Sequence, residues 1–240
     1  MQRSPRGYAM KQYETRQTRT EYLRIQIERS NAKFKYCKVS TNDVRKYVDV
    51  VTRHRYRRSV RGPIGPILCL GTRNGREVDL FRIQCFGPFW LRWSSSWMER
   101  RTQSFTTVFP QLEALGRSDL NALGDASVIG VELNPRAARS DVWTGSFDAM
   151  PADWVNRFRI VYSNSFDHSE DCERTAREWR RVIRPGGYLV FSFTHDKNPT
   201  LSDRVGGLML ADVRALFQGD LVYFQDRGSS NGYSEVILQC

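Results

Sequence analysis

The stretch Ile67-Leu-Cys-Leu-Gly-Thr-Arg-Asn-Gly-Arg-Glu-Val78 decides the fold. Four apolar residues, 67–70, form a short run typical of a strand that is buried on both faces. Gly71 and Gly75 then enclose a polar loop, and apolar residues follow at helical spacing as far as Cys85. The pattern predicts a strand, a glycine turn and a helix. Bare glycine backbone and the free N–H groups of a helix start suit a ligand, so the turn is either purely structural or one wall of a ligand site.

The composition sets the broad class of the protein. A chain of 240 residues accommodates one sizeable α/β domain with an extension. No apolar run approaches the roughly 18 residues of a membrane span, and the N-terminus lacks the apolar core of a signal peptide. The five cysteines show no metal-ligand spacing. We therefore expect a reduced, cytoplasmic protein without a metal site.

The positive charge is concentrated in the first quarter of the chain. Residues 1–61 hold 17 Lys and Arg against 5 Asp and Glu, whereas residues 62–240 hold 20 against 21. A basic segment is either a solvated tail or a contact for an anionic partner, such as nucleic acid or a lipid surface. With nucleic acid, Tyr47 or Tyr56 would stack on bases. The near-neutral remainder favours a small-molecule acceptor over nucleic acid as the substrate.

The N-terminal quarter is predicted to be an extension with one helix. Residues 1–32 carry few large aliphatic side chains, and we expect much of this segment to be mobile or to fold only against a partner. Ser40 to Asn42 are good N-cap residues, and an apolar face from Val44 to Val51 follows them. Gly62-Pro63 then breaks the chain. The predicted domains are a basic extension, 1–61, and a main domain, 62–240.

An aromatic insert interrupts the main domain at residues 86–124. Gly75 and Glu132 lie 57 positions apart, and the insert places three of the six tryptophans within eight residues. Such a segment is a substrate lid, a partner or membrane surface, or simply an additional piece of core. Because it begins just after the glycine loop and carries bulky rings, we expect it to cover the acceptor side of a site.

Further strands follow the insert. A second buried strand, 127–131, ends in Glu132, an acid that at this position either accepts the hydroxyls of a bound ribose or is a plain strand terminus. A short strand and loop occupy 142–151, and the apolar strand 158–162 leads into the polar segment 163–169. Polar residues after successive parallel strands meet at one edge of the sheet, where ligands bind.

The last portion completes an α/β pattern. A helix beginning near Cys172 is stopped by Arg184-Pro-Gly-Gly187, and a strand follows at 188–193. A helix at 211–217 and two strands, 221–224 and 236–238, close the chain, with a hairpin loop at 228–232. This order predicts a mostly parallel sheet with an antiparallel edge.

The order of these segments resembles the class I S-adenosylmethionine-dependent methyltransferases, especially those that act on small molecules. The similar segments are the glycine loop 68–75, the strand end 130–135, the loop 143–151, the strand and loop 158–169 and, most specifically, the helix, Pro-Gly-Gly turn and strand of 178–191. The resemblance implies a Rossmann-like fold with a seven-stranded, mostly parallel sheet, an antiparallel C-terminal hairpin and helices on both faces. It also implies S-adenosylmethionine as cofactor. The implied cofactor-binding residues are Gly71, Thr72, Arg73, Asn74, Gly75, Glu132, Leu133, Asn134, Phe147, Asp148, Ser163 and Asn164.

The chain departs from the family pattern at three positions. Cys69 stands where the family usually has an acid that supports the methionine moiety, and Arg73 stands where a glycine is common. Ser146 replaces an acid that contacts the adenine amine, which leaves Asp148 as a substitute two residues later.

A catalytic base is expected in the segment after the fourth strand. Methyl transfer needs an in-line acceptor, and a base only when the acceptor must lose a proton. Asp167 and His168 are the candidates, because a histidine titrates near neutrality and an adjacent acid raises its basicity. His168 alternatively packs locally, and His195 is the reserve candidate.

The sequence thus predicts a methyltransferase that transfers a methyl group to O or N of a small molecule. One alternative is a methyltransferase-like binding protein without catalysis, which contacts nucleic acid or a membrane through residues 1–61. Another is a nicotinamide-dependent oxidoreductase, but Gly71 and Gly75 do not form the Gly-x-Gly-x-x-Gly fingerprint.

Overall fold

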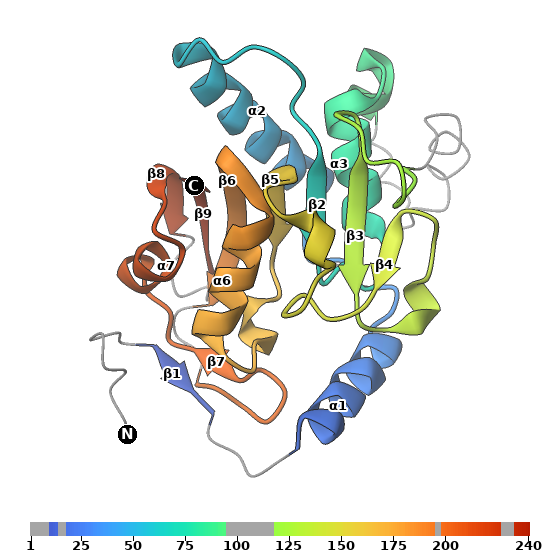
Figure 1. Cartoon of the computed structure of the whole chain (residues 1–240), viewed down its shortest axis with the longest axis vertical. Helices are drawn as coiled ribbons and strands as arrows, with labels where there is room; N and C mark the ends of the chain where they lie inside the picture. Colours follow the sequence, from blue (N-terminus) through green and yellow to red (C-terminus); the bar gives the residue numbers. More distant parts are fainter. Residues whose placement is uncertain (1–9, 14–17, 95–117, 195–197, 227–232) are drawn as a thin grey trace.

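The structure, a computed structural model, describes residues 10–13, 18–94, 118–194, 198–226 and 233–240. Its main sheet has seven strands in the order β4-β3-β2-β5-β6-β9-β8 (Figure 1). These strands are β2 (Ile67–Leu70), β3 (Val128–Glu132), β4 (Val142–Thr144), β5 (Phe158–Ser163), β6 (Ile183–Thr194), β8 (Asp220–Asp226) and β9 (Tyr233–Gln239). The helices are α1 (Arg19–Ala32), α2 (Thr41–Arg57), α3 (Arg76–Phe86), α6 (Cys172–Val182) and α7 (Leu210–Phe217).

The sheet is parallel except at its C-terminal end. Strands β2 to β6 pair in parallel, and β9 runs antiparallel to both of its neighbours, β6 and β8. The predicted fold class, with its antiparallel C-terminal hairpin, is therefore confirmed. A small second sheet pairs β1 (Lys11–Gln12) with β7 (Val205–Gly206).

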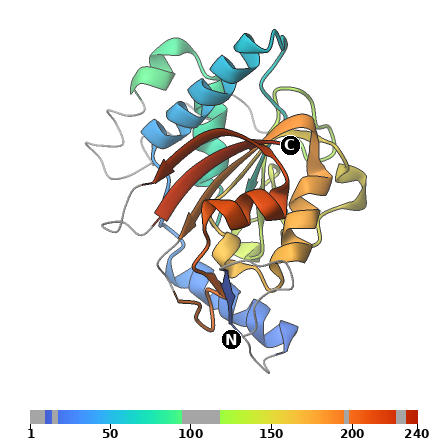
Figure 2. The ribbon, with the colours of Figure 1, turned by 90° about the vertical axis from the view of Figure 1, so that its left-hand side faces the viewer.

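Helices cover both faces of the main sheet (Figure 2). On one face α2 and α3 pack on side chains of β2 and β5, with Val44, Phe81 and Cys69 in the same buried cluster. On the other face α6 and α7 contribute Trp179 and Phe217, whose rings pack with centroids 5.9 Å apart. The strands alternate between these two apolar layers because successive side chains point to opposite faces.

The N-terminal quarter contains two helices among its described residues, where the sequence predicted one. Helix α2 begins as predicted, with Ser40 as N-cap and a capping box to Asp43. Helix α1 was missed, and the expectation of mobility is wrong for residues 19–32. A second capping box, between Thr18 and Glu21, starts this helix. Both helices pack on the main domain, and the division at residue 62 stays a prediction.

One arginine of the N-terminal quarter is used inside the molecule. Arg55 is buried and donates to the carbonyls of Arg61 and Gly62. Tyr47 is also buried, and its hydroxyl donates to Glu235 at 2.7 Å. Stacking of Tyr47 on nucleic-acid bases is therefore wrong, because the ring lies in the core. Tyr56 is 85% exposed and keeps a free face.

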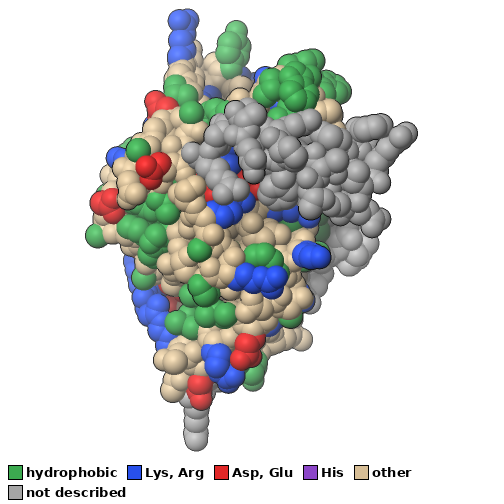
Figure 3. Space-filling model, turned by 90° about the vertical axis from the view of Figure 1, so that its right-hand side faces the viewer, with side chains coloured by type: hydrophobic (Ala, Val, Ile, Leu, Met, Phe, Trp, Pro, Cys, Tyr) green, Lys and Arg blue, Asp and Glu red, His purple; other side chains and the backbone are tan. Residues whose placement is uncertain are grey.

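The predicted insert lies mostly outside the described residues, which omit 95–117. Its two described ends lie at the amino edge of the sheet, since Phe86 and Asp125 both approach Gly65, just before β2. Phe89 and Trp93 are 70% and 63% exposed. Hydrophobic side chains gather at the top of the face shown in Figure 3, beside the undescribed residues. The role of the insert at the acceptor side of the site stays a prediction.

Candidate functional site

The glycine loop crosses the carboxyl edge of the sheet directly after β2. Gly71 has φ of +73°, and a Cβ added there would lie 2.6 Å from the hydroxyl oxygen of Ser165. Arg73 also adopts a positive φ, +52°, although it carries a side chain. Its backbone N–H donates to the Glu132 carboxylate at 2.7 Å. The loop is thus held between β3 and the segment after β5.

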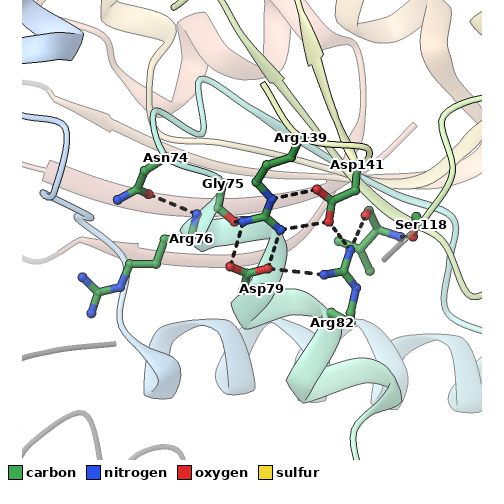
Figure 4. A network of polar contacts seen from close by, with 9 residues as sticks. Asn74, Gly75, Arg76, Asp79, Arg82, Ser118, Arg139 and Asp141 are labelled. Carbon is green, nitrogen blue, oxygen red and sulfur yellow. Dashed lines mark hydrogen bonds and ion pairs between the residues drawn. The ribbon is translucent and has the colours of Figure 1, made fainter. Parts of the chain in front are cut away.

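A buried set of ion pairs supports this loop from behind (Figure 4). The loop-support network consists of Asp79, Arg82, Arg139 and Asp141. Arg139 binds Asp79 at 2.6 Å and Asp141 at 2.8 Å, and Arg82 binds Asp141 at 2.6 Å. Burial raises the pKa of Asp141, but the bonds to Arg139 and Arg82 outweigh that effect and lower it. Since Arg139 also reaches the Gly75 carbonyl at 3.5 Å, the network ties α3 and the loop to the start of β4.

Glu132 is the centre of the carboxyl edge. Its side chain is buried, and one oxygen accepts from Arg73 while the other accepts from the Ser30 hydroxyl and the Asn134 N–H, both at 3.1 Å. The side-chain amide of Asn134 donates in turn to Ser30 and Asn31. Glu132, the predicted ribose acceptor, thus lies at the end of β3, and α1 already occupies one of its acceptor positions.

Helix α1 lies across this edge of the sheet (Figure 1), and the side chains that it turns toward the edge are mostly polar. The Tyr22 hydroxyl donates to the His168 carbonyl at 2.5 Å, and the Gln26 amide donates to the Ser202 carbonyl at 2.6 Å. Arg29 pairs with Asp203 at 2.5 Å. These residues, with Ser30, lie three or four positions apart and so share one face of the helix. Hydrogen bonds and ion pairs, rather than an apolar stripe, hold α1 in position.

A first cavity of about 750 Å³ lies between α1 and the sheet. Its walls include predicted residues from three strand ends: Gly71, Arg73, Glu132, Leu133, Phe147 and Asp148. Phe147 packs edge-on against Trp179, and the Thr175 hydroxyl donates to Asp148 at 2.5 Å. Burial raises the pKa of Asp148 to about 6.

A second cavity of about 630 Å³ adjoins the first. The two share Gly71, Arg73, Ser165 and His168, together with Arg29 and Lys33 of α1. The predicted residues Asn164 and Asp167 line the second cavity, and Glu77 of α3 does so as well. A ligand that spans both cavities would cross Gly71, where the positive φ and the nearby Ser165 side chain already require a residue without a Cβ.

The second cavity contains a group of titratable side chains. We call Glu77, Asp167, His168 and Asp203 the cavity cluster. The His168 ring lies 3.2 Å from Asp203 and 3.8 Å from Asp167. Burial lowers the pKa of His168, but the two carboxylates outweigh burial and raise it. Asp167 Oδ1 is buried without a hydrogen-bond partner among the described residues.

Asp167, His168 and Asp203 also place potential metal-ligand atoms within 4.8 Å of one another. However, the guanidinium of Arg29 lies 2.5 Å from the same Asp203 oxygen that faces His168. The trio is therefore already an ion-pair cluster with a cation of its own, and we assign it no metal.

The structure separates the predicted site residues into two groups. Gly71, Arg73, Glu132, Leu133, Phe147, Asp148, Asn164, Asp167 and His168 line the two cavities. Thr72, Asn74, Gly75, Asn134 and Ser163 line neither of them. In this second group, Asn74 caps the start of α3 and the Ser163 hydroxyl bridges β5 to β2. Contact of any of these residues with a cofactor stays a prediction, and His195 lies outside the described residues.

Sequence analysis missed the contribution of α1 and of Glu77. The motif Thr18-x-x-Glu21 was the available signal for α1, since it is the pattern of a capping box. No comparable signal existed for Glu77, because the direction of a side chain in the first turn of a helix depends on the packing of that helix.

Comparisons with known proteins agree with this geometry. A family model described as a methyltransferase domain matches residues 113–191. Malonyl-[acyl-carrier protein] O-methyltransferase 1 of Coxiella burnetii is 36% identical over 73 residues, which are 28% of this chain and 25% of that protein. The match thus spans about a quarter of the length of this curated relative.

Two solved structures share the fold. The 1,6-didemethyltoxoflavin-N1-methyltransferase of Burkholderia thailandensis, bound to 1,6-didemethyltoxoflavin and S-adenosylhomocysteine, superposes with a TM-score of 0.55 at 11% identity, covering 96% of this chain and 94% of that one. The N-methyltransferase NodS of Bradyrhizobium japonicum, bound to S-adenosylhomocysteine, has a TM-score of 0.52 at 10% identity, covering 89% and 97%.

The strand order and the helices on both faces define the Rossmann-like methyltransferase fold. The family match covers residues 113–191, about a third of the chain, and joins the fold to a sequence signature like that of the class I S-adenosylmethionine-dependent methyltransferases. The predicted class is confirmed, and S-adenosylmethionine is the cofactor of that class. In the described part of the chain, no helix combines the length and apolar character that a bilayer crossing requires.

Proposed function

We propose that the protein transfers a methyl group from S-adenosylmethionine to an oxygen or nitrogen of a small-molecule acceptor. The observation that carries this proposal is the pair of adjoining cavities at the carboxyl edge, which meet at Gly71. The first is lined by Glu132, Phe147 and Asp148, and the second holds titratable groups. The names of the similar proteins, an O-methyltransferase and two N-methyltransferases, support the same reaction class.

The residues of the first cavity would hold the adenosine part of the cofactor. Glu132 would accept the ribose hydroxyls, and Asp148, beside the ring of Phe147, would accept the adenine amine. Both ribose hydroxyls need the acceptor position that Ser30 now holds on Glu132. Cofactor binding therefore requires the Ser30 hydroxyl to turn away or α1 to shift.

The residues of the second cavity would orient the acceptor and move its proton. When bound, the cofactor supplies an electrophilic methyl group. Asp167 has a buried oxygen without a partner and is the better proton acceptor. His168, with its raised pKa, keeps its proton further toward neutrality and so holds Asp167 and Asp203 in place. This assignment keeps both predicted catalytic residues and gives them different roles.

Calorimetric titration of S-adenosylmethionine and S-adenosylhomocysteine into the full chain tests the proposal. We expect binding of both to the wild type, and a roughly 10- to 100-fold loss of affinity in Glu132→Ala, since hydrogen bonds to a charged group are worth about 1.5–3 kcal/mol. Glu28→Gln, on the exposed side of α1, is the matched control for loss of an acid. Equal affinities in the wild type and Glu132→Ala would contradict the placement of the ribose.

An anionic partner for residues 1–61 stays a prediction. Nucleic acid is the partner that the basic composition favours, and exposed Tyr56 on α2 is the aromatic side chain that keeps a free face for it. The small-molecule acceptor is the substrate that the cavities support.

A further inference from the structure

Glu77 is a buried acid that forms no ion pair within 4.0 Å among the described residues. It is the second residue of α3, its side chain is 5% exposed, and it lines the second cavity. Its Oε2 atom has no hydrogen-bond partner among the described residues. Its own backbone N–H and the Cys37 thiol act to lower the pKa of this carboxyl group, but less strongly than burial raises it. Arg73, the nearest cation, directs its guanidinium to the carbonyl of Tyr36.

Such a carboxylate is unfavourable unless a ligand completes its hydrogen bonds. Burial raises the pKa of Glu77 to about 7, so that the charged form is present at physiological pH only at a cost in free energy. A buried acid in an apolar layer is normally replaced by an apolar residue or paired with a cation. Retention of this acid at a cavity wall indicates a cationic group in the ligand.

The charged side chains around the second cavity suit a ligand that carries both a positive and a negative group. Arg29, Lys33 and Arg73 line the same cavity as Glu77. Arg73 and Lys33 would face a carboxylate, while the open oxygen of Glu77 would face an ammonium group. The amino-acid end of S-adenosylmethionine has this pair of charges, and the shared wall at Gly71 leads from the first cavity to the second.

Glu77 also acts on Cys69, the position in β2 where the expected acid is absent. Cys69 stands in β2 where the resemblance implied an acid that supports the methionine moiety. Burial raises the pKa of the Cys69 thiol, and Glu77 is the charged group that adds most to this shift. The carboxyl group of Glu77, carried by the following helix, therefore acts electrostatically on the strand position from which an acid is missing.

We propose that Glu77 binds the ammonium group at the amino-acid end of S-adenosylmethionine, in place of the acid that is absent at Cys69. This inference rests on the proposed function and adds a residue to the same site. Glu77 is a binding residue, because it touches the cofactor far from the transferred methyl group.

The experiment compares two ligands that differ only at this end of the molecule. S-adenosylhomocysteine carries the amino-acid end, whereas 5′-methylthioadenosine lacks it and keeps the adenosine. Calorimetry on the full chain should show Glu77→Gln binding S-adenosylhomocysteine about 10- to 100-fold more weakly, as expected for loss of a charged hydrogen bond. Its affinity for 5′-methylthioadenosine should stay within about twofold of the wild type, which also shows that the variant is folded.

Two variants calibrate the comparison. Glu28→Gln should leave both affinities unchanged, whereas Glu132→Ala should weaken both ligands, since each retains the ribose. Equal weakening of both ligands by Glu77→Gln would overturn the inference and make Glu77 a support of the glycine loop. No change for either ligand would overturn it as well. Failure of the wild type to bind any of these adenosine ligands would instead overturn the proposed function.

Discussion

Two groups of buried charges flank the glycine loop, and they differ in how completely they are paired. In the loop-support network two arginines face two aspartates, and Asp79, Arg82 and Asp141 are almost fully buried. In the cavity cluster three acids surround one histidine and Arg29 pairs only with Asp203, while Glu77 and Asp167 each keep a buried oxygen without a hydrogen-bond partner among the described residues. The loop-support network contacts the loop at the Gly75 carbonyl, and the cavity cluster lines the second cavity together with the loop residues Gly71 and Arg73. A closed network stabilises structure, whereas an open one reserves hydrogen-bonding capacity for a ligand.

The largest effect is expected in the closed network. Asp141→Ala leaves Arg82 and Arg139 with one aspartate between them, and breaking a buried ion pair costs about 3–5 kcal/mol. We expect a loss of that size in the free energy of unfolding, measured by urea denaturation. Asp167→Asn, the matched change in the cavity cluster, should alter stability by less than about 1 kcal/mol, because only a long, partly exposed ion pair to His168 is lost. Similar losses in both variants would erase the distinction between the two groups.

Removal of an unpaired charge should instead stabilise the protein without ligand. The pKa of Glu77 rises from 4.5 to about 7 on folding. Its contribution to stability is therefore complete below about pH 4.5 and is lost as pH rises through 7. Glu77→Gln does not titrate, so it should gain on the order of 1–3 kcal/mol over the wild type at pH 8 and nothing at pH 4.5.

Urea denaturation at both pH values measures this difference. The groups that act on Glu77 come from every neighbouring element: Cys37, Cys69, Arg73, Glu132 and Tyr162. Of these, the thiols of Cys37 and Cys69 and the phenol of Tyr162 have pKa values raised well above their ordinary values, so they stay neutral at pH 8. A gain that is independent of pH would point to packing rather than charge.

The histidine of the cavity cluster offers a third test. Asp167 and Asp203 raise the pKa of His168, whereas burial and the charges of Arg58 and Arg57 lower the pKa of His54. In an NMR titration His168 should therefore titrate above His54. Asp167→Asn should lower the value for His168 and leave His54 unmoved. An unchanged His168 in this variant would remove Asp167 from the cluster.

The smallest effect concerns the hydroxyl that α1 places on Glu132. Ser30→Ala frees an acceptor position for the ribose, and we expect affinity for S-adenosylhomocysteine to rise roughly two- to fivefold, as for one neutral hydrogen bond. Calorimetry on the full chain measures it, with Glu28→Gln again as the control on the same helix. Weaker binding would mean that Ser30 helps to hold the ligand instead of competing with it.

The framework of the fold could be predicted because its signals are local. Each signal predicts the structure of its own segment: four consecutive apolar residues predict a strand, and the glycine turn and the Pro-Gly-Gly stop mark where elements end. The order of these segments then predicts the sheet. Glu132 was found in the same way, as an acid at the end of a buried strand.

The covering of the site could not be predicted because it depends on tertiary contacts. The inner face of α1 is formed by Tyr22, Gln26 and Arg29, and such polar residues give no apolar stripe for a periodicity argument to detect. Glu77 sits in a helix whose apolar residues were recognised, but its burial follows from how α3 packs on β2 and β5. The residues of α1 that cover the site are therefore harder to predict from the sequence than the strand-end residues on which the site is built.

The polar inner face of α1 has a consequence for how affinity will be measured. A helix that buries only Tyr22 and Ser30 gains little from hydrophobic burial, so its attached and detached states differ by the strength of a few hydrogen bonds. If only the detached state admits the ribose, the apparent dissociation constant equals the intrinsic one divided by the detached fraction. Salt, which weakens the pairing of Arg29 with Asp203, would then tighten cofactor binding, the reverse of its usual effect on a charged ligand.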